Sequence, residues 1–290
     1  MKGVILAGGS GKRLWPITEV VCKQLLPVYD KPMIYYPLST LILSGVTEVL
    51  IITSPNQKLY FENLLGNGSK LGISISYKIQ LKPLGLAHGV HLAEDFVKKE
   101  SFWFILGDNL FHGLDFGLQL KEQIISDGAK IFCYRMADVH GFGVANFSSD
   151  GRIESIVEKP VNSKSNWVVP GIYLFDSSVF EKFANLIPSS RNELEIVDLL
   201  NAYIREEKLS FKKLSRGNAW FDCGTAKDLL SASNYVHIVQ SRQGSLVGSP
   251  EEVAFRCGLI RKEHLVKFDS SQFDSSYSSM LTDISQGTDN

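Results

Sequence analysis

The chain has 290 residues, of which 30 are basic and 31 acidic, so its formal net charge is −1. This balance argues against a partner held mainly by bulk charge, such as a nucleic acid or an anionic membrane. The composition, 44% hydrophobic and 21% charged, excludes global disorder.

No apolar run approaches the roughly 18 residues that a transmembrane helix needs, and the N-terminus lacks a signal-peptide pattern. The cysteines lie far apart with no C-x-x-C, which argues against a zinc site or a disulfide framework. We therefore expect a cytoplasmic globular protein.

Short apolar runs rich in β-branched or aromatic residues alternate with longer amphipathic stretches in the first half of the chain. Helical patterns lie between the runs, for example over Pro32–Ser44 and Leu86–Val97. Continuous apolarity is typical of strands that are buried on both faces. The order predicts an α/β fold, a Rossmann-like, mostly parallel mixed sheet with helices on both faces. The predicted strands are Gly3–Ala7, Glu48–Thr53, Ile73–Ile79, Phe102–Leu106 and Ala129–Tyr134.

The pattern changes after about residue 140. Gly143–Phe147 and Arg152–Val157 flank an Asp-Gly turn signal and predict a small β-hairpin elaboration. Val168–Phe175 predicts a strand and Glu193–Glu207 a helix. We interpret 1–290 as a single domain, with a core over about 1–225 and a mostly helical C-terminal part over about 226–290. The serine-rich end, Asp269–Asn290, is expected to be mobile.

A glycine-rich segment, LAGGSGKRL over residues 6–14, follows the first predicted strand at once. In open α/β sheets ligands bind at the carboxyl ends of the strands. Glycines allow backbone amides to approach an anion closely, and Lys12 and Arg13 add positive charge. The segment is neither a Walker loop nor a dinucleotide fingerprint, which argues against a nicotinamide dehydrogenase. A plain glycine-rich turn is the alternative, but the adjacent cations favour phosphate binding.

Several motifs in the same order resemble those of the sugar-1-phosphate nucleotidylyltransferases, most closely their thymidylyl-transferring members. The first is GVILAGGSGKRLWPIT, followed by KQLLPVYDKPMIYYPL. In the first of these two stretches, Lys12 stands where the family usually has Thr. Further motifs extend the resemblance over almost the whole chain. They are Gln80…Pro83…Gly85-Leu86-Ala87, Leu106-Gly107-Asp108-Asn109, Glu158-Lys159-Pro160, Arg191-Asn192-Glu193-Leu194-Glu195-Ile196, Arg216…Ala219-Trp220…Asp222 and Pro250-Glu251-Glu252-Val253-Ala254.

The resemblance implies that an oxygen of glucose 1-phosphate attacks the α-phosphorus of dTTP, which yields dTDP-glucose and pyrophosphate. Such a nucleophile is already an anion, so catalysis must come from positioning and from neutralising phosphoryl charge. A uridylyltransferase that uses UTP is an alternative. A non-catalytic regulatory relative is another, but we would expect it to have lost Arg13, Lys23, Asp108 or Asp222, and all four are present. The family also implies a homo-oligomer, a dimer of dimers.

The resemblance assigns Arg13 to the departing pyrophosphate, where a planar guanidinium suits two oxygens at once. It places Lys23 near the α-phosphate, although an isolated Lys is usually a solvated surface residue. Asp108 ends the run FWFILGD, where Mg²⁺ is often held through carboxylates and phosphates, and Asp222 would be the second ligand. An isolated Asp is otherwise a common turn or N-cap residue. We expect Asp222 to follow a strand of the same central sheet.

The remaining binding residues also follow from the resemblance. In the sugar site Glu158 would contact hydroxyl groups and Lys159 the sugar phosphate, although a charged pair before a Pro is most often only a loop. Gln80 would read the pyrimidine, since an amide can both donate to and accept from its imide edge. The other nucleotide-binding residues would be Leu6, Gly8, Gly9, Gly11, Pro83 and Gly85, and the other sugar-binding residues Phe142, Gly143, Val169, Gly171 and Arg191.

Three further features lie outside this set of substrate-binding residues. Arg216, Glu252 and Val253 match a second, regulatory nucleotide-sugar site in the family. His88 and His91 could share one face of a helix, but with no third ligand in sight we interpret them as ordinary helix residues. Cys22 and Cys223 are interpreted as packing residues, with a reactive Cys223 as the alternative.

Overall fold

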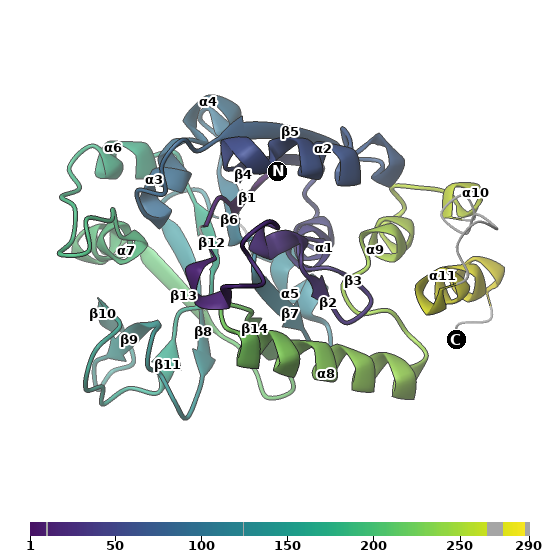
Figure 1. The fold of residues 1–290 in the computed structure, drawn as a ribbon. Helices are drawn as coiled ribbons and strands as arrows, with labels where there is room; N and C mark the ends of the chain where they lie inside the picture. Colours follow the sequence, from purple (N-terminus) through teal and green to yellow (C-terminus); the bar gives the residue numbers. More distant parts are fainter. Residues whose placement is uncertain (10, 124, 266–274, 288–290) are drawn as a thin grey trace.

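The computed structural model describes residues 1–9, 11–123, 125–265 and 275–287. A ten-stranded mixed sheet runs through the centre, with the order β10-β9-β11-β8-β12-β6-β1-β4-β5 and β13 beside β8 (Figure 1). The strands are β1 Lys2–Ala7, β2 Pro27–Val28, β3 Lys31–Pro32, β4 Glu48–Thr53, β5 Ser74–Ile79, β6 Phe102–Leu106, β7 Asn109–His112, β8 Ala129–Arg135, β9 Gly143–Phe147, β10 Ile153–Glu158, β11 Trp167–Val168, β12 Ile172–Phe175, β13 Leu209–Lys213 and β14 Ala219–Asp222. The α-helices are α1 Tyr35–Leu43, α2 Lys58–Leu65, α3 Leu86–His91, α4 Glu94–Val97, α5 Phe116–Lys121, α6 Val179–Phe183, α7 Ile196–Arg205, α8 Ala226–Gln243, α9 Pro250–Arg256, α10 Lys262–Leu265 and α11 Ser276–Gln286.

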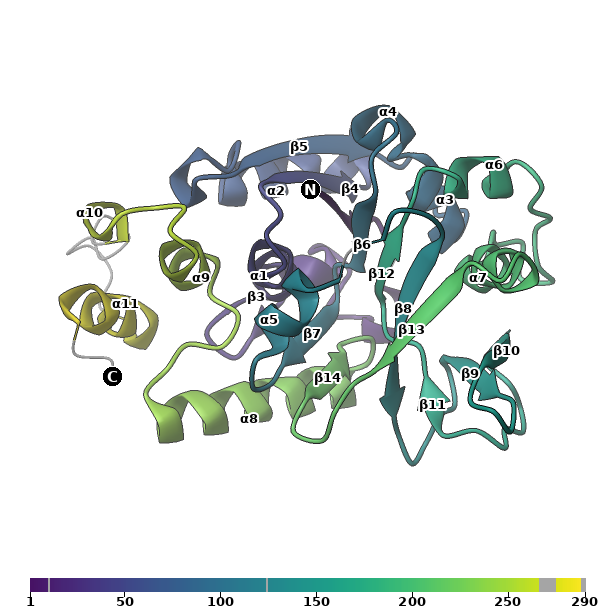
Figure 2. The ribbon, with the colours of Figure 1, turned by 180° about the vertical axis from the view of Figure 1, so that it is seen from behind.

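The predicted α/β class and the five predicted core strands are confirmed. Strands β6, β1, β4 and β5 pair in parallel, whereas β12 runs antiparallel to both β6 and β8. Side chains that alternate along β1 enter two different cores. Ile5 packs in one core with residues of α1, and Val4 in the other with residues of α3 and α7. Helices therefore cover both faces of the sheet, as Figures 1 and 2 show from opposite sides.

Two predicted elements are divided in the structure. The expected strand Val168–Phe175 becomes β11 and β12, because Pro170 and Gly171 interrupt the ladder. The expected helix Leu86–Val97 becomes α3 and α4, since the amide of Ala93 bonds to the carbonyl of Val90 and tightens the turn.

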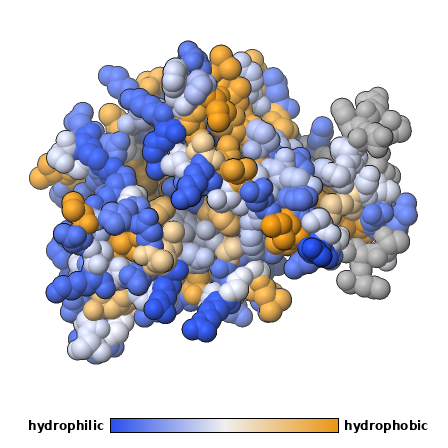
Figure 3. Space-filling model, turned by 60° about the horizontal axis from the view of Figure 1, so that its bottom comes forward, coloured by the Kyte–Doolittle hydropathy of each residue, from blue (hydrophilic) through white to orange (hydrophobic). Residues whose placement is uncertain are grey.

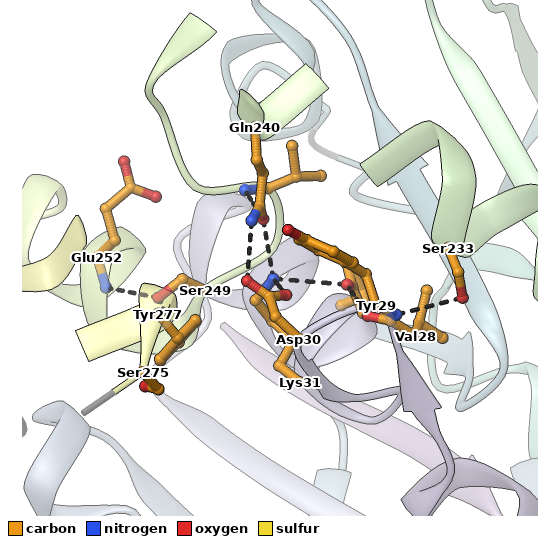
Figure 4. Close-up of polar contacts among 12 residues, drawn as sticks. Val28, Tyr29, Asp30, Lys31, Ser233, Gln240, Ser249, Glu252, Ser275 and Tyr277 are labelled. Carbon is orange, nitrogen blue, oxygen red and sulfur yellow. Dashed lines mark hydrogen bonds and ion pairs between the residues drawn. The ribbon is translucent and has the colours of Figure 1, made fainter. Parts of the chain in front are cut away.

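The C-terminal part is helical, as predicted, and attaches to the β2–β3 hairpin through buried polar contacts (Figure 4). The ammonium of Lys31 bonds to Asp30 and, at 3.0 Å, to the side-chain oxygen of Gln240 in α8. It also lies 5.3 Å from the ring centre of Tyr277 in α11, whose hydroxyl bonds to Ser249.

Part of the end that we expected to be mobile forms a helix. A capping box of Ser275 and Ser278 begins helix α11, which packs on α9. The rest of Asp269–Asn290, residues 269–274 and 288–290, lies outside the described residues.

Candidate functional site

Two neighbouring cavities open where the parallel strands β1, β5 and β6 end. Leu6 of β1, Gln80 after β5 and Leu106 of β6 line their walls. Figure 3 brings forward the side on which α8 and β9–β11 lie, a hollowed face that mixes hydrophilic and hydrophobic residues. Arg13 lines both cavities, so they meet at its side chain.

The first cavity, of about 310 Å³, gathers every residue expected to bind the nucleotide. Gly11 has a φ of 61° and precedes the 3₁₀ turn Lys12–Leu14, which carries Arg13. A left-handed backbone of this kind strains other residues, so glycine is suited to the position. The expected residues in its lining are Leu6, Gly8, Gly9, Gly11, Arg13, Lys23, Gln80, Pro83 and Gly85.

Close approaches explain two of these glycines. A Cβ on Gly8 would lie 2.6 Å from the side-chain oxygen of Gln80. A Cβ on Gly85, whose φ is 107°, would lie 2.4 Å from the carbonyl oxygen of Leu194. The contact at Gly85 is with backbone and requires a residue without a side chain, whereas a Cβ on Gly8 would displace the Gln80 side chain.

Lys23 lies on the 3₁₀ turn Lys23–Leu25 and is buried, contrary to the usual position of a lysine. Its ammonium makes a short ion pair with Asp108, which follows β6 and also accepts a bond of 3.0 Å from Asn109. Burial alone would lower the pKa of Lys23 and raise the pKa of Asp108. The pairing reverses both directions, so the pKa of Lys23 is raised and that of Asp108 is lowered. Both groups are therefore charged at neutral pH.

Asp222 reaches the site in a way that corrects our expectation. It ends β14, which pairs with β7 in a separate two-stranded sheet and not with the central sheet. The antiparallel register sets Asp222 opposite Asn109, and the amide of Cys223 bonds to the carbonyl of Asp108 at 3.0 Å. The two carboxylates thus meet because β7 begins directly after Asp108. Burial, and then the charge of Asp108, raises the pKa of Asp222 to about 7. Arg13 lies 3.9 Å from the same carboxylate.

The second cavity, of about 240 Å³, gathers the residues expected to bind the sugar. Glu158 accepts from Lys159 and from Arg191, each at 3.1 Å. Arg191 also contacts Glu195 at 2.9 Å, so its charge is shared among carboxylates. The expected residues in the lining are Arg13, Asp108, Phe142, Gly143, Glu158, Lys159, Val169, Gly171, Arg191 and Asp222.

Our prediction gave no role to Asn109, although its side chain organises this cavity. Its oxygen accepts from the backbone of Gly171 at 3.0 Å and from the indole of Trp220 at 2.7 Å. The ring of Trp220 in turn lies 5.1 Å from that of Phe142, edge to face. The position of Asn109 directly after Asp108 could have signalled this role. Tyr173 and Glu193 also line the cavity. Glu193 lies in the motif Arg191–Ile196, which could have signalled it, whereas nothing in the local sequence distinguishes Tyr173.

The residues expected at a regulatory site do not all meet. Glu252 and Val253 line a third cavity, of about 370 Å³, together with Phe116 and Lys121 of α5. Arg216 is not part of that lining. Cys22 and Cys223 are buried, and burial raises the pKa of both thiols, which agrees with packing residues and argues against a reactive Cys223.

None of the described helices has the length and apolarity to cross a lipid bilayer. In the same part of the chain, no three His, Cys, Asp or Glu side chains gather as a metal site. Within the described ranges, Asp108 and Asp222 are therefore not joined by a third side chain of these types.

Comparison with known proteins gives consistent matches. The chain is 45% identical to a glucose-1-phosphate thymidylyltransferase of Mycobacterium tuberculosis strain CDC 1551, over 98% of this chain and 99% of the relative. A glucose-1-phosphate thymidylyltransferase of Neisseria meningitidis serogroup A is also 45% identical, over 97% of this chain and 98% of the relative. A solved structure of a UDP-glucose pyrophosphorylase with UDP-glucose matches with a TM-score of 0.72 and 25% identity, over 82% of this chain and 98% of the other.

The family model described as nucleotidyl transferase matches residues 2–238, which span the central sheet and both substrate-sized cavities. With this match and relatives that align along nearly its whole length, the chain belongs to the nucleotidyl transferase family.

Proposed function

We propose that this protein is a glucose-1-phosphate thymidylyltransferase, which converts dTTP and glucose 1-phosphate into dTDP-glucose and pyrophosphate. The observation that carries the proposal is the pair of cavities that meet at Arg13, with Lys23 in one and Asp108 in the other. Relatives of that name match nearly end to end. The substrates are metabolites of the cytoplasm, where we expect the enzyme to act.

In this proposal a phosphate oxygen of glucose 1-phosphate forms a bond to the α-phosphorus of dTTP. The bond from that phosphorus to the bridging oxygen breaks, and pyrophosphate leaves with the electron pair. Lys23 would neutralise charge at the α-phosphate, held in place by Asp108. The exposed guanidinium of Arg13 would hold the departing pyrophosphate. Fixed cations of this kind lower the barrier because they need no reorganisation during the reaction.

Asp108 and Asp222 fit a divalent cation, which we propose to be Mg²⁺. The two carboxylates converge, and the pKa of Asp222 is raised by burial and then by the charge of Asp108, which Lys23 and Arg13 only partly offset. Mg²⁺ is typically held by one or two carboxylates together with substrate phosphates, which suits a pair that no third carboxylate joins among the described residues. When bound, the ion would neutralise charge on the phosphoryl oxygens.

We propose that Glu158 binds sugar hydroxyls and that Lys159 binds the sugar phosphate. Lys159 has a φ of 45°, and its backbone amide bonds to the carbonyl of Phe142 at 3.0 Å, so its position is fixed by the loop. Arg191 is engaged with three carboxylates, Glu158, Glu193 and Glu195. We therefore propose that Arg191 holds these three carboxylates in place and does not serve the sugar phosphate alone.

The activity is tested by measuring pyrophosphate release for dTTP, UTP, CTP and GTP against glucose, galactose and mannose 1-phosphates. The proposal expects dTTP at or above UTP, with glucose 1-phosphate as the best acceptor. A clear preference for UTP would favour the uridylyltransferase, to which the UDP-glucose pyrophosphorylase structure is related by fold. A preference for GTP or mannose 1-phosphate would contradict the assignment.

We further propose that the third cavity binds a nucleotide sugar that regulates the enzyme, with Glu252 and Val253 in its wall. Calorimetry that detects two sites per chain for dTDP-sugar would support this, and one site with strictly competitive inhibition would contradict it. The expected dimer of dimers stays a prediction, which sedimentation equilibrium tests.

A further inference from the structure

Gln80 has a side-chain partner that lies outside the expected substrate-binding residues. The residue follows β5, its backbone amide bonds to the carbonyl of Thr53 at 2.8 Å, and only 4% of it is exposed. Its side-chain nitrogen Nε2 lies 3.0 Å from Nδ1 of His88, on α3. The helix is itself anchored, because the amide of Ala87 bonds to the carbonyl of Leu194. His88 therefore approaches Gln80 from a fixed backbone.

This contact couples the orientation of the Gln80 amide to the tautomer of His88. An amide nitrogen can only donate, so Nδ1 of His88 must accept and the ring proton must sit on Nε2. Burial, and then the neighbouring His91, lowers the pKa of His88, which favours the neutral ring that this bond needs. The rotated amide would place its oxygen against Nδ1 and would need the other tautomer, with the proton on Nδ1, which is the less favoured form of a neutral imidazole.

With Nε2 held by His88, the side-chain oxygen of Gln80 lies beside Gly8, 2.6 Å from the position of a Cβ there. Both residues line the first cavity, which we call the nucleotide cavity because it gathers the residues expected to bind the nucleotide. None of the described residues donates a hydrogen bond to this oxygen, so it can accept from a ligand. The second hydrogen of Nε2 can donate alongside it.

The pyrimidine bases differ at the ring nitrogen N3. In thymine and uracil N3 carries a hydrogen and is flanked by carbonyl oxygens, whereas in cytosine N3 is an acceptor beside an amino group. An amide that offers its oxygen to N3 therefore bonds to thymine or uracil and opposes cytosine. The reversed amide would have the opposite preference.

We propose that His88 is a positioning residue that holds the Gln80 amide with its oxygen toward the nucleotide cavity, so that thymine and uracil are selected over cytosine. This inference rests on the proposed function, in which Gln80 reads the base. His88 itself need not touch the nucleotide.

The test compares kcat/KM for dTTP and dCTP, with glucose 1-phosphate as acceptor, in His88→Leu, His88→Asp and His91→Leu. Leucine removes the acceptor, so both amide orientations become available, whereas aspartate is an acceptor only and keeps the original one. His91 lies one turn along the same helix and contacts Glu94 and Phe183, which makes it the matched control. Because both nucleotides carry the same triphosphate, charge effects of the aspartate cancel in the ratio.

We expect the dTTP-to-dCTP ratio to fall about tenfold in His88→Leu, mostly because kcat/KM for dCTP rises. A gain with dCTP is not the result of a merely loosened fold. The ratio should stay within about twofold of the parent in His88→Asp and in His91→Leu. In a Gln80→Leu background, His88→Leu should leave the ratio unchanged, since the amide that it orients is absent.

An unchanged ratio in His88→Leu, or an equal loss for both nucleotides, would overturn the inference. So would an effect of His88→Leu that persists without Gln80. Thermal melting establishes that each variant is folded, and His88→Ala replaces leucine if that variant is not. If the parent enzyme releases no pyrophosphate from any triphosphate, it is the proposed function that fails. If the parent is active and selective and only the His88 variants behave otherwise than expected, the positioning role alone fails.

Discussion

The two cavities of the site are built from different kinds of residue. The nucleotide cavity is lined largely by glycines and apolar side chains, with the cations Lys12, Arg13 and Lys23. The sugar cavity carries acidic and basic groups that pair with one another, above all Glu158 with Lys159 and Arg191. The cations of the nucleotide cavity differ in burial, since 62% of the Arg13 side chain is exposed but only 10% of the Lys23 side chain.

This difference matches the two ligands that we propose. A triphosphate carries concentrated charge, which backbone amides and fixed cations recognise without a crowded wall of side chains. A sugar presents many hydroxyl groups, which need both donors and acceptors in set directions. Arg13 lines both cavities. Its loss should therefore lower turnover more than it weakens the binding of either substrate.

The largest effects are expected for the two cations. Arg13→Ala and Lys23→Ala should each lower turnover by about two to three powers of ten, because preorganised charge is lost at an anionic transition state. Their stabilities should differ. Lys23→Ala leaves Asp108 buried without its partner and should cost about 3 kcal/mol in the free energy of unfolding. Steady-state kinetics and chemical denaturation measure the two quantities.

Arg13→Ala should unfold as the parent does, since its side chain is largely exposed. Arg152→Ala is the matched control, because Arg152 is 81% exposed and pairs with Asp150 on the hairpin turn. Lys23 differs from Arg13 in this respect, because its side chain is buried. Full stability of Lys23→Ala would contradict the view that the pair is structural as well as functional.

The second effect concerns Asp222, where activity and stability should change in opposite directions. Asp222→Asn should lower turnover by about two powers of ten, and added Mn²⁺ should restore part of it if metal affinity is what was lost. The pKa of Asp222 is raised to about 7 in the fold, so the native state holds its proton more tightly than the unfolded chain. The aspartate therefore costs stability as pH rises from about 4 through 7, and asparagine does not.

In metal-free buffer, the excess stability of Asp222→Asn over the parent should thus be larger at pH 8 than at pH 5. Urea denaturation at the two pH values measures it. An excess that shrinks as the pH rises would show that the carboxylate is stabilised by its surroundings, which would argue against a site that awaits a cation.

The third effect separates two neighbouring glycines of the nucleotide cavity. Gly8→Ala places a Cβ against the Gln80 side chain and should raise the KM for dTTP about tenfold, with little change in the KM for glucose 1-phosphate. Gly9→Ala is the matched control, since a Cβ there meets nothing within 4 Å. Equal KM values for the two variants would show that Gln80 does not form the base end of the cavity.

The smallest effect is expected for the sugar cavity. Phe142→Tyr adds one hydroxyl to a ring that packs against Trp220, and kcat/KM for any sugar 1-phosphate should change by no more than about threefold. A grid of sugar phosphates measures it. A large change confined to one sugar would show that the edge of the Phe142 ring faces the substrate. Recognition of the sugar would then depend less on the paired charges of the cavity than we infer.

The sequence by itself determined the core strands and most members of the two cavities. Strands such as β4 begin and end where the apolar runs do, because a strand buried on both faces must be apolar at every position. The glycine-rich loop was equally visible, since its conformation depends on residues within a few positions of one another. Family resemblance then supplied roles that no local pattern contains, for Gln80, Glu158 and Lys159 above all.

Only the tertiary structure decided how distant segments meet. Asp222 reaches Asp108 through the β7–β14 pair, across 114 residues of sequence, and not through the central sheet that we expected. The burial of Lys23 and the bond from Gln80 to His88 likewise depend on packing between separate elements. Hydrophobic periodicity records which side of an element is buried, but the partner and the register are properties of the assembled core. The side chains that orient the site therefore become visible only once the chain is folded.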